Sequence, residues 1–252
     1  MVTSTDLQTV FSWHMDTPVY VVDYAVEAPI IVATGATWVS LQFLVDNERP
    51  APGPALDDLN VIDAWVLHRW DPKAGTASDV ATYGLGGAAL LTTGLLGKRH
   101  GGLAPAVILV EAWTCTGLTV EVLKQATDRS RPFVRYNDPT DDIIKAQQNH
   151  DATMSFPSGH TAFAAAATFT VARMLDDVDA VPAWVAYSSA GALTTTVGVL
   201  RVLAGKHYPT DVVIGALIGG TYGLVLPVLH HQDRAVSLRV AGPREVAVVV
   251  TW

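Results

Sequence analysis

The chain contains few charged residues, and those it has are weighted toward acid. Only 16% of its 252 residues are Asp, Glu, Lys or Arg, whereas soluble domains carry about 25%. The formal net charge is -8, which argues against a nucleic-acid-binding protein because such proteins are usually basic. Half of the residues are apolar, and the mean hydropathy is +0.29. The composition therefore favours a membrane protein over a soluble one.

Cysteine and N-terminal basic residues are also scarce. The single cysteine, Cys115, cannot form an internal disulfide and leaves the redox compartment open. It lies in the apolar run AWTCTGL, so we interpret it as a packed core residue. Residues 1–27 contain no Lys or Arg and lack the positive start of a secretory signal. We therefore expect an internal segment to direct membrane insertion.

Six apolar stretches organise the sequence, and most are about 18 residues long. This length is close to the roughly 20 residues that a helix needs to cross a bilayer. The stretches are residues 28–45, 80–97, 103–120, 161–175, 183–200 and 212–230. The pattern predicts one all-α domain over residues 1–252, a bundle of about six long transmembrane helices. A soluble bundle with unusually apolar core helices is the alternative.

The polar links between these stretches predict the topology. If all six stretches span, residues 46–79, 124–160 and 201–211 lie on one face, and both chain ends lie on the other. Basic residues mark the cytoplasmic side of a membrane protein, and they occur in KRHGG at 98–102 and in the tail beyond residue 231. The links at residues 46–79, 124–160 and 201–211 are therefore expected on the extracytoplasmic face.

Three short polar segments carry the residues suited to chemistry, and all three fall on that same face. They read KQATDRSRP, FPSGHTAF and RVLAGKHYPTD. Arginine offers a planar fork to phosphate oxygens, and lysine offers a compact point charge. A pocket built from these segments therefore suits a phosphate group. Its cations, histidines and carboxylate are Lys124, Arg131, Arg201, His160, His207 and Asp211.

The spacing within the second and third segments adds detail. Ser158, Gly159 and His160 should open a helix, where free N–H groups and the helix dipole favour an anion. His207 and Asp211 are four residues apart and can share a helical face. Asp211 could then accept the Nδ1 proton of His207, which leaves Nε2 as an attacking lone pair.

These segments resemble the tripartite signature of the type 2 phosphatidic acid phosphatase and vanadium haloperoxidase superfamily. That signature reads KxxxxxxRP, PSGH and SRxxxxxHxxxD. The first two parts match in full, and LRVLAGKHYPTD departs only at Leu200, where the family usually has Ser. The resemblance covers residues 124–211, and HYPTDV followed by an apolar helix looks most like the integral-membrane branch.

The resemblance implies a metal-independent phosphatase that acts through a phosphohistidine. His207 would attack phosphorus, Asp211 would orient it, and His160 would protonate the leaving oxygen and later activate water. The non-bridging oxygens would be held by Lys124, Arg131, Ser158, Gly159 and Arg201. We expect no metal or other cofactor, because no carboxylate cluster with metal-ligand spacing accompanies the motifs.

Two other functions share these residues. A vanadium-dependent haloperoxidase would hold vanadate on His207, and a non-catalytic membrane scaffold would keep only the fold. Within the phosphatase interpretation, the motifs bind the shared phosphate and leave the lipid tail open. The expected partners are a membrane and a lipid phosphate or isoprenoid diphosphate, without nucleic acid. The sequence predicts no oligomeric state.

Three further polar residues have weaker interpretations. Arg129 is as consistent with a solvated loop as with a wider positive field. Glu111 lies within an apolar stretch and is costly if it faces lipid, so we expect a hydrogen-bonded place inside the bundle; a polar link to the headgroup pocket is the alternative. His230 sits at a helix end, where capping is favoured over metal binding.

Overall fold

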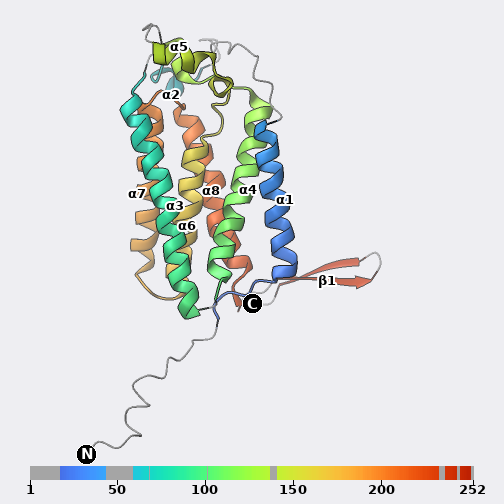
Figure 1. Ribbon diagram of the computed structural model, residues 1–252. Helices are drawn as coiled ribbons and strands as arrows, with labels where there is room; N and C mark the ends of the chain where they lie inside the picture. Colours follow the sequence, from blue (N-terminus) through green and yellow to red (C-terminus); the bar gives the residue numbers. More distant parts are fainter. Residues whose placement is uncertain are drawn as a thin grey trace, which may run out of the picture.

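A computed structural model describes residues 18–43, 59–67, 69–100, 102–136, 141–232, 236–242 and 245–250. Long helices make up most of this part of the chain and pack side by side (Figure 1). They are α1 (Tyr24–Phe43), α3 (Pro72–His100), α4 (Ala104–Thr127), α6 (Gly159–Asp177), α7 (Ala183–Leu203) and α8 (Pro209–Leu229). Each overlaps most of one apolar stretch, so the predicted helical bundle is confirmed.

Shorter elements join the long helices. They are α2 (Val61–Ala64), α5 (Asp141–Gln148) and the 3-10 turns η2 (Pro132–Arg135) and η3 (His150–Thr153). The tail departs from the all-α pattern, because strands β1 (Val236–Gly242) and β2 (Glu245–Val250) pair antiparallel. Residues 1–17 of the acidic N-terminal segment lie outside the described residues.

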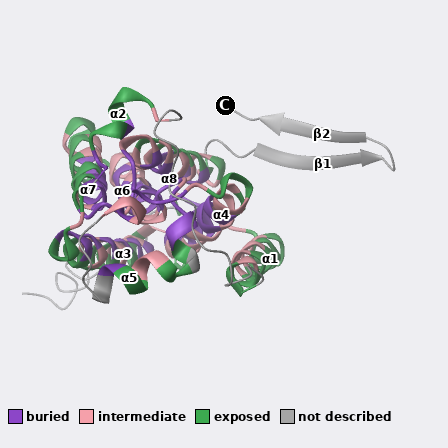
Figure 2. Ribbon diagram, turned by 90° about the horizontal axis from the view of Figure 1, so that it is seen from above, coloured by how far each residue is buried: buried purple, intermediate pink, exposed green. Residues whose placement is uncertain are grey.

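Four described helical segments are long and apolar enough to cross a membrane. They are α1, α3, the segment Ala104–Arg135 that includes α4, and α8. By length and composition, the chain is a multi-pass membrane protein. The helices α6 and α7 are not among these four. The helix α6 carries Arg173, Asp176 and Asp177 toward its end, and its alanines at 162 and 164–167 are buried against neighbouring helices. Figure 2 shows α6 near the middle of the bundle.

Small residues allow α6 and α8 to approach closely. A Cβ on Gly219 of α8 would lie 1.9 Å from the carbonyl oxygen of Ala162. Side chains larger than glycine are therefore excluded there, as at close helix contacts in membranes. Nearer the start of α8, a Cβ on Gly215 would lie 2.4 Å from the carbonyl oxygen of Ser158. The starts of α6 and α8 therefore lie side by side, and the functional segments lie at those two helix ends.

The two ends of the bundle differ as the alternating topology predicts. The helices α2 and α5 and their links lie at one end, and the start of α1 and the link from α3 to α4 lie at the other (Figure 1). The N-terminal ends of α6 and α8 share the end with α2 and α5. All three polar segments singled out from the sequence therefore meet at one end.

Candidate active site

Local backbone features aim the three segments at one another. The helix α4 ends at Asp128, whose φ of 44° is left-handed, and the chain then turns toward Arg131. Gly205 follows α7 with φ +68°, and a Cβ there would lie 1.9 Å from the carbonyl oxygen of Arg69. Only glycine fits this turn, which carries the chain from Arg201 to His207.

His207 lies at the centre of the site and is 1% exposed. Its Nδ1 is 2.6 Å from the carbonyl oxygen of Ser155, and its Nε2 is 3.1 Å from Nη1 of Arg131. A carbonyl oxygen can only accept, so Nδ1 carries the proton and Nε2 keeps a lone pair. Burial and the positive charges of Arg131 and Arg201 hold the pKa of His207 well below its usual range. The imidazole is therefore neutral at pH 7.

Asp211 contacts His207 less directly than the spacing predicted. Its Oδ2 is 3.8 Å from His207 Nδ1, beyond hydrogen-bond range. That oxygen accepts instead from Ser155 Oγ at 2.6 Å and from the backbone N–H of Tyr208 at 2.9 Å. The predicted direct bond is therefore wrong, because the Ser155 carbonyl occupies the Nδ1 position. Ser155 connects the two residues through its hydroxyl and its carbonyl.

Arg131 is fixed by several acceptors. Its Nε donates to the carbonyl oxygen of Asp151 at 2.6 Å, and its Nη2 pairs with the Asp151 carboxylate at 2.6 Å. Its Nη1 donates to the carbonyl oxygen of Lys206 at 3.0 Å and faces His207 Nε2. A guanidinium held in this way is aimed at the position where His207 would bond an incoming atom.

His160 and Arg201 share one carboxylate, which the sequence analysis missed. Asp79 Oδ1 is 2.9 Å from His160 Nε2 and 2.8 Å from Arg201 Nη1. Arg201 Nη1 also donates to Ser78 Oγ at 3.1 Å. Asp79 lies on α3 immediately before an apolar stretch, 81 positions from His160 in the chain. No spacing rule links residues so far apart, so only the fold reveals this contact.

Two of the expected phosphate donors, Ser158 and Gly159, lie at the start of α6. The Ser158 hydroxyl is buried and lies 2.9 Å from Thr161 Oγ1, and it makes no capping bond to the helix. Its backbone N–H donates to the carbonyl oxygen of Asp211 at 3.0 Å. Lys124 Nζ lies 3.9 Å from the position that a Cβ on Gly159 would take. Glycine at this position therefore leaves an open path between the helix N-terminus and the ammonium.

Two lysines supply positive charge without an ion pair. Within the described part of the chain, neither Lys124 nor Lys206 has a carboxylate oxygen within 4.0 Å. Burial and the nearby charge of Arg201 lower the pKa of Lys206. Lys206 was not among the site residues expected from the sequence, although it directly precedes His207. Both ammonium groups are therefore available to an anion.

Arg129 is a structural residue and not a solvated one. Its Nη2 pairs with Asp63 at 2.8 Å, its Nη1 contacts the Asp211 carboxylate, and its guanidinium carbon lies 4.2 Å from the centre of the Tyr208 ring. Asp63 is fully buried and also accepts from Thr210 Oγ1 at 2.7 Å. Burial opposes ionisation of Asp63, but the bonds from Thr210 and Arg129 outweigh it and lower its pKa. This contact ties α2 to the start of α8.

A cavity of about 520 Å³ extends from the charged residues into the bundle. Lys124, Gly159 and His160 line it at the polar end. The remaining wall is mainly apolar and comes from α1, α3, α4 and α6, with Trp38, Leu90, Trp113 and Phe163 among its residues. A pocket with a charged end and an apolar body matches an amphipathic ligand.

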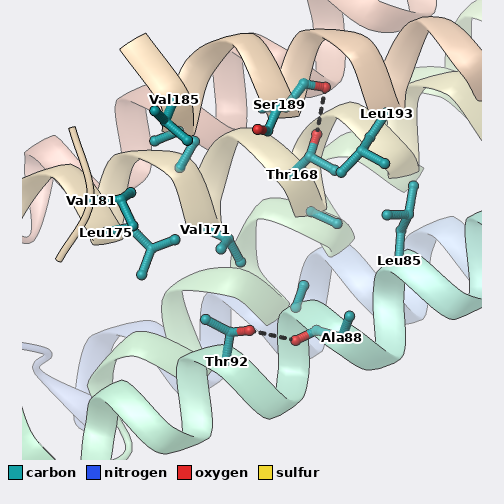
Figure 3. A pocket seen from close by; sticks show the side chains of 15 residues that line it. Leu85, Ala88, Thr92, Thr168, Val171, Leu175, Val181, Val185, Ser189 and Leu193 are labelled. Carbon is teal, nitrogen blue, oxygen red and sulfur yellow. Dashed lines mark hydrogen bonds between the residues drawn. The ribbon is translucent and has the colours of Figure 1, made fainter. Parts of the chain in front are cut away.

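A second pocket, of about 250 Å³, lies between α3, α6 and α7 (Figure 3). None of its lining residues is ionisable. Its threonine hydroxyls are already bonded, since Thr92 donates to the Ala88 carbonyl and Thr168 to the carbonyl of Ala190. This pocket therefore offers no charged group that would bind a phosphate.

Comparison with known proteins agrees with the geometry. The PAP2 superfamily model matches residues 105–235, and the chain belongs to this superfamily. Lipid A 1-phosphatase of Rhizobium etli is 31% identical over 121 residues, which are 46% of this chain and 47% of that protein. The Rhizobium johnstonii protein of the same name is 30% identical over 121 residues, 46% of this chain and 44% of its own length. The match thus spans about half the length of these curated relatives.

One solved structure is also similar. It is a transmembrane PAP2 type phosphatidylglycerolphosphate phosphatase from Bacillus subtilis, with 19% sequence identity and a TM-score of 0.46. The similarity covers 81% of this chain and 92% of that chain.

Proposed function

We propose that the protein is a phosphatase that removes phosphate from a lipid phosphate or isoprenoid diphosphate without a metal ion. The observation that carries this proposal is a buried neutral imidazole, His207, whose Nε2 lone pair lies among fixed cations. The apolar cavity that begins at Lys124 and His160 would take the lipid part of the substrate. The similarity to two lipid A 1-phosphatases supports the same substrate class.

In the proposed first step, His207 Nε2 forms a bond to phosphorus while the bond to the leaving oxygen breaks. Arg131, now 3.1 Å from that nitrogen, would turn its donors to the phosphate oxygens. Lys124, Arg201 and the Gly159 N–H would hold the same oxygens. Preorganised donors of this kind are worth on the order of a hundredfold in rate each.

His160 would supply and recover the proton. It would protonate the leaving oxygen, then take a proton from the water that attacks the phosphohistidine and releases inorganic phosphate. The Asp79 carboxylate, 2.9 Å from its Nε2, would stabilise the protonated ring. Asp211 would hold His207 through Ser155, since the two oxygens of Ser155 contact both residues.

The active site would face the extracytoplasmic side. The basic link that follows α3 lies at the opposite end of the bundle from His207, and basic links mark the cytoplasmic side. A membrane-impermeant phosphate ester should be hydrolysed by intact cells and not by sealed inside-out vesicles. Hydrolysis only by the vesicles would reverse the orientation.

The function is tested by phosphate release from a panel of lipid phosphates, isoprenoid diphosphates and water-soluble esters. His207→Ala should lose at least about a thousandfold in rate, because the nucleophile is removed. His100→Ala, a histidine at the opposite end of the bundle, is the matched control. A His207→Ala protein with normal turnover would overturn the proposal.

The intermediate and the absence of a catalytic metal are tested separately. Phosphorus-labelled substrate, quenched in alkali, should leave acid-labile label on the wild type and none on His207→Ala. Turnover at a temperature where the protein stays folded should survive EDTA. Loss of turnover that Mg²⁺ restores would contradict the metal-independent mechanism.

A further inference from the structure

A second polar cluster lies at the end of the bundle opposite the proposed active site. It joins Glu27 in the first turn of α1, Glu111 of α4 and His230 at the end of α8. Glu111 is 13 residues from Lys124 along α4, about 20 Å at 1.5 Å per residue. The cluster is therefore separate from the phosphate site.

The geometry of the three side chains matches a ligand set. His230 Nε2 is 3.2 Å from Glu27 Oε1 and 3.6 Å from Glu111 Oε2. One possible ligand atom from each residue lies within 4.8 Å of the other two. Two ligands on a tetrahedral ion with bonds of about 2.0–2.1 Å stand about 3.3 Å apart. The observed separations are close to this spacing.

His230 is oriented as a metal ligand would be. Its Nδ1 lies 2.9 Å from the carbonyl oxygen of Leu226, which can only accept, so Nδ1 carries a proton. In the neutral ring, the Nε2 lone pair then faces two carboxylates. A second ring nitrogen bonded to a backbone carbonyl is the usual outer-shell arrangement of a metal-bound histidine.

The buried carboxylates of the cluster have fewer hydrogen-bond partners than their oxygens can accept. The side chains of Glu27, Glu111 and His230 are only 14%, 8% and 10% exposed. Glu111 Oε2 and Glu27 Oε2 are buried and have no hydrogen-bond partner in the described part of the chain. Carboxylates at membrane depth are costly unless a cation or proton neutralises them. The unpartnered Glu111 oxygen is the one that points at His230.

We propose that Glu27, Glu111 and His230 bind a divalent transition-metal ion of the zinc class. Imidazole with carboxylates suits zinc and its neighbours, whereas magnesium and calcium prefer all-oxygen sites. The ion fixes α1 to α4 and α8. Apart from the largely covered Glu27 side chain, α1 is only partly buried, yet it contributes Trp38 and Gln42 to the wall of the apolar cavity. The ion therefore stabilises that wall and takes no part in phosphate release.

The test uses tag-free, full-length protein in detergent, stripped with EDTA and then titrated with zinc. The wild type should bind one zinc per chain by elemental analysis. Its Tm should rise by about 5 °C at zinc concentrations a hundredfold above Kd. Glu111→Gln and His230→Ala should lose the bound ion and the rise in Tm, while keeping turnover of a water-soluble phosphate ester.

The controls are another buried glutamate of α4 and the histidine that follows His230 in the chain. Glu121→Gln on α4 and His231→Ala beside His230 should both keep the bound zinc. Equal zinc in wild type and Glu111→Gln would overturn the proposal. A wild type that binds no zinc would also overturn it. In that case, a Glu111→Gln protein as stable as the wild type would indicate that Glu27 and Glu111 share a proton.

Discussion

The two ends of the bundle hold buried charge of opposite sign. At the active-site end, Lys124 and Lys206 have no carboxylate within ion-pair distance in the described part of the chain. At the other end, Glu27 and Glu111 share one histidine and keep unpartnered oxygens. Uncompensated buried charge is costly, which is why we propose a ligand of the opposite sign at each end. One end suits a phosphate and the other a metal cation.

Among changes that leave the nucleophile in place, the largest expected effect comes from Asp79, the carboxylate that joins His160 to Arg201. Asp79→Asn should reduce kcat/KM by about a hundredfold, because a proton-transfer group loses its partner. The alkaline limb of the pH–rate profile should also move to lower pH, since the carboxylate stabilises the protonated imidazole. Asp128→Asn is the control, because asparagine tolerates the left-handed backbone there. An unchanged pH profile would show that Asp79 does not act on His160.

Asp63 tests how far the active-site end depends on its ion pairs for stability. Asp63→Asn breaks the pair with Arg129, which is 25% exposed, and should lower the free energy of unfolding by about 2 kcal/mol. The change should appear as a lower Tm, and zinc binding at the other end should persist. A stable Asp63→Asn protein would mean that Asp211 alone suffices to hold Arg129.

Ser155 tests the indirect link between Asp211 and His207. Ser155→Ala removes the hydroxyl that donates to Asp211 and keeps the carbonyl that accepts from His207. We expect a loss of about tenfold in kcat, the usual worth of one hydrogen bond to a charged group. A double-mutant cycle with Asp211→Asn should show coupling, because both changes break one path. Strict additivity would indicate that Asp211 acts on His207 by its charge alone.

The smallest expected effect is on the pH dependence of stability. The pKa of His207 is lowered in the folded protein and is about 6.5 when unfolded. Below about pH 6.5 the unfolded chain therefore binds a proton that the folded chain does not. As the pH is lowered through this range, the free energy of unfolding decreases by up to about 1.4 kcal/mol per pH unit. His207→Gln should flatten the Tm profile below pH 6.5, and His231→Gln should not. Parallel profiles for wild type and His207→Gln would contradict a buried neutral imidazole.

The sequence alone determined the helices and the residue types of the site. Apolar stretches of nearly bilayer length predict their own helices, because the backbone in lipid must bond within each segment. Alternation of sides then placed Lys124, His160 and His207 at one end of the bundle. The motif residues needed no tertiary information, since each segment contains its own basic residues or histidine.

Only the tertiary structure decided how these residues are paired. Asp79 and Asp63 reach the site from α3 and α2, and no local pattern indicates that they bind His160 or Arg129. The same holds for Glu27, Glu111 and His230, each of which is an isolated polar residue in the sequence. Contacts between distant segments depend on how whole helices pack, and short-range spacing carries no information about that packing.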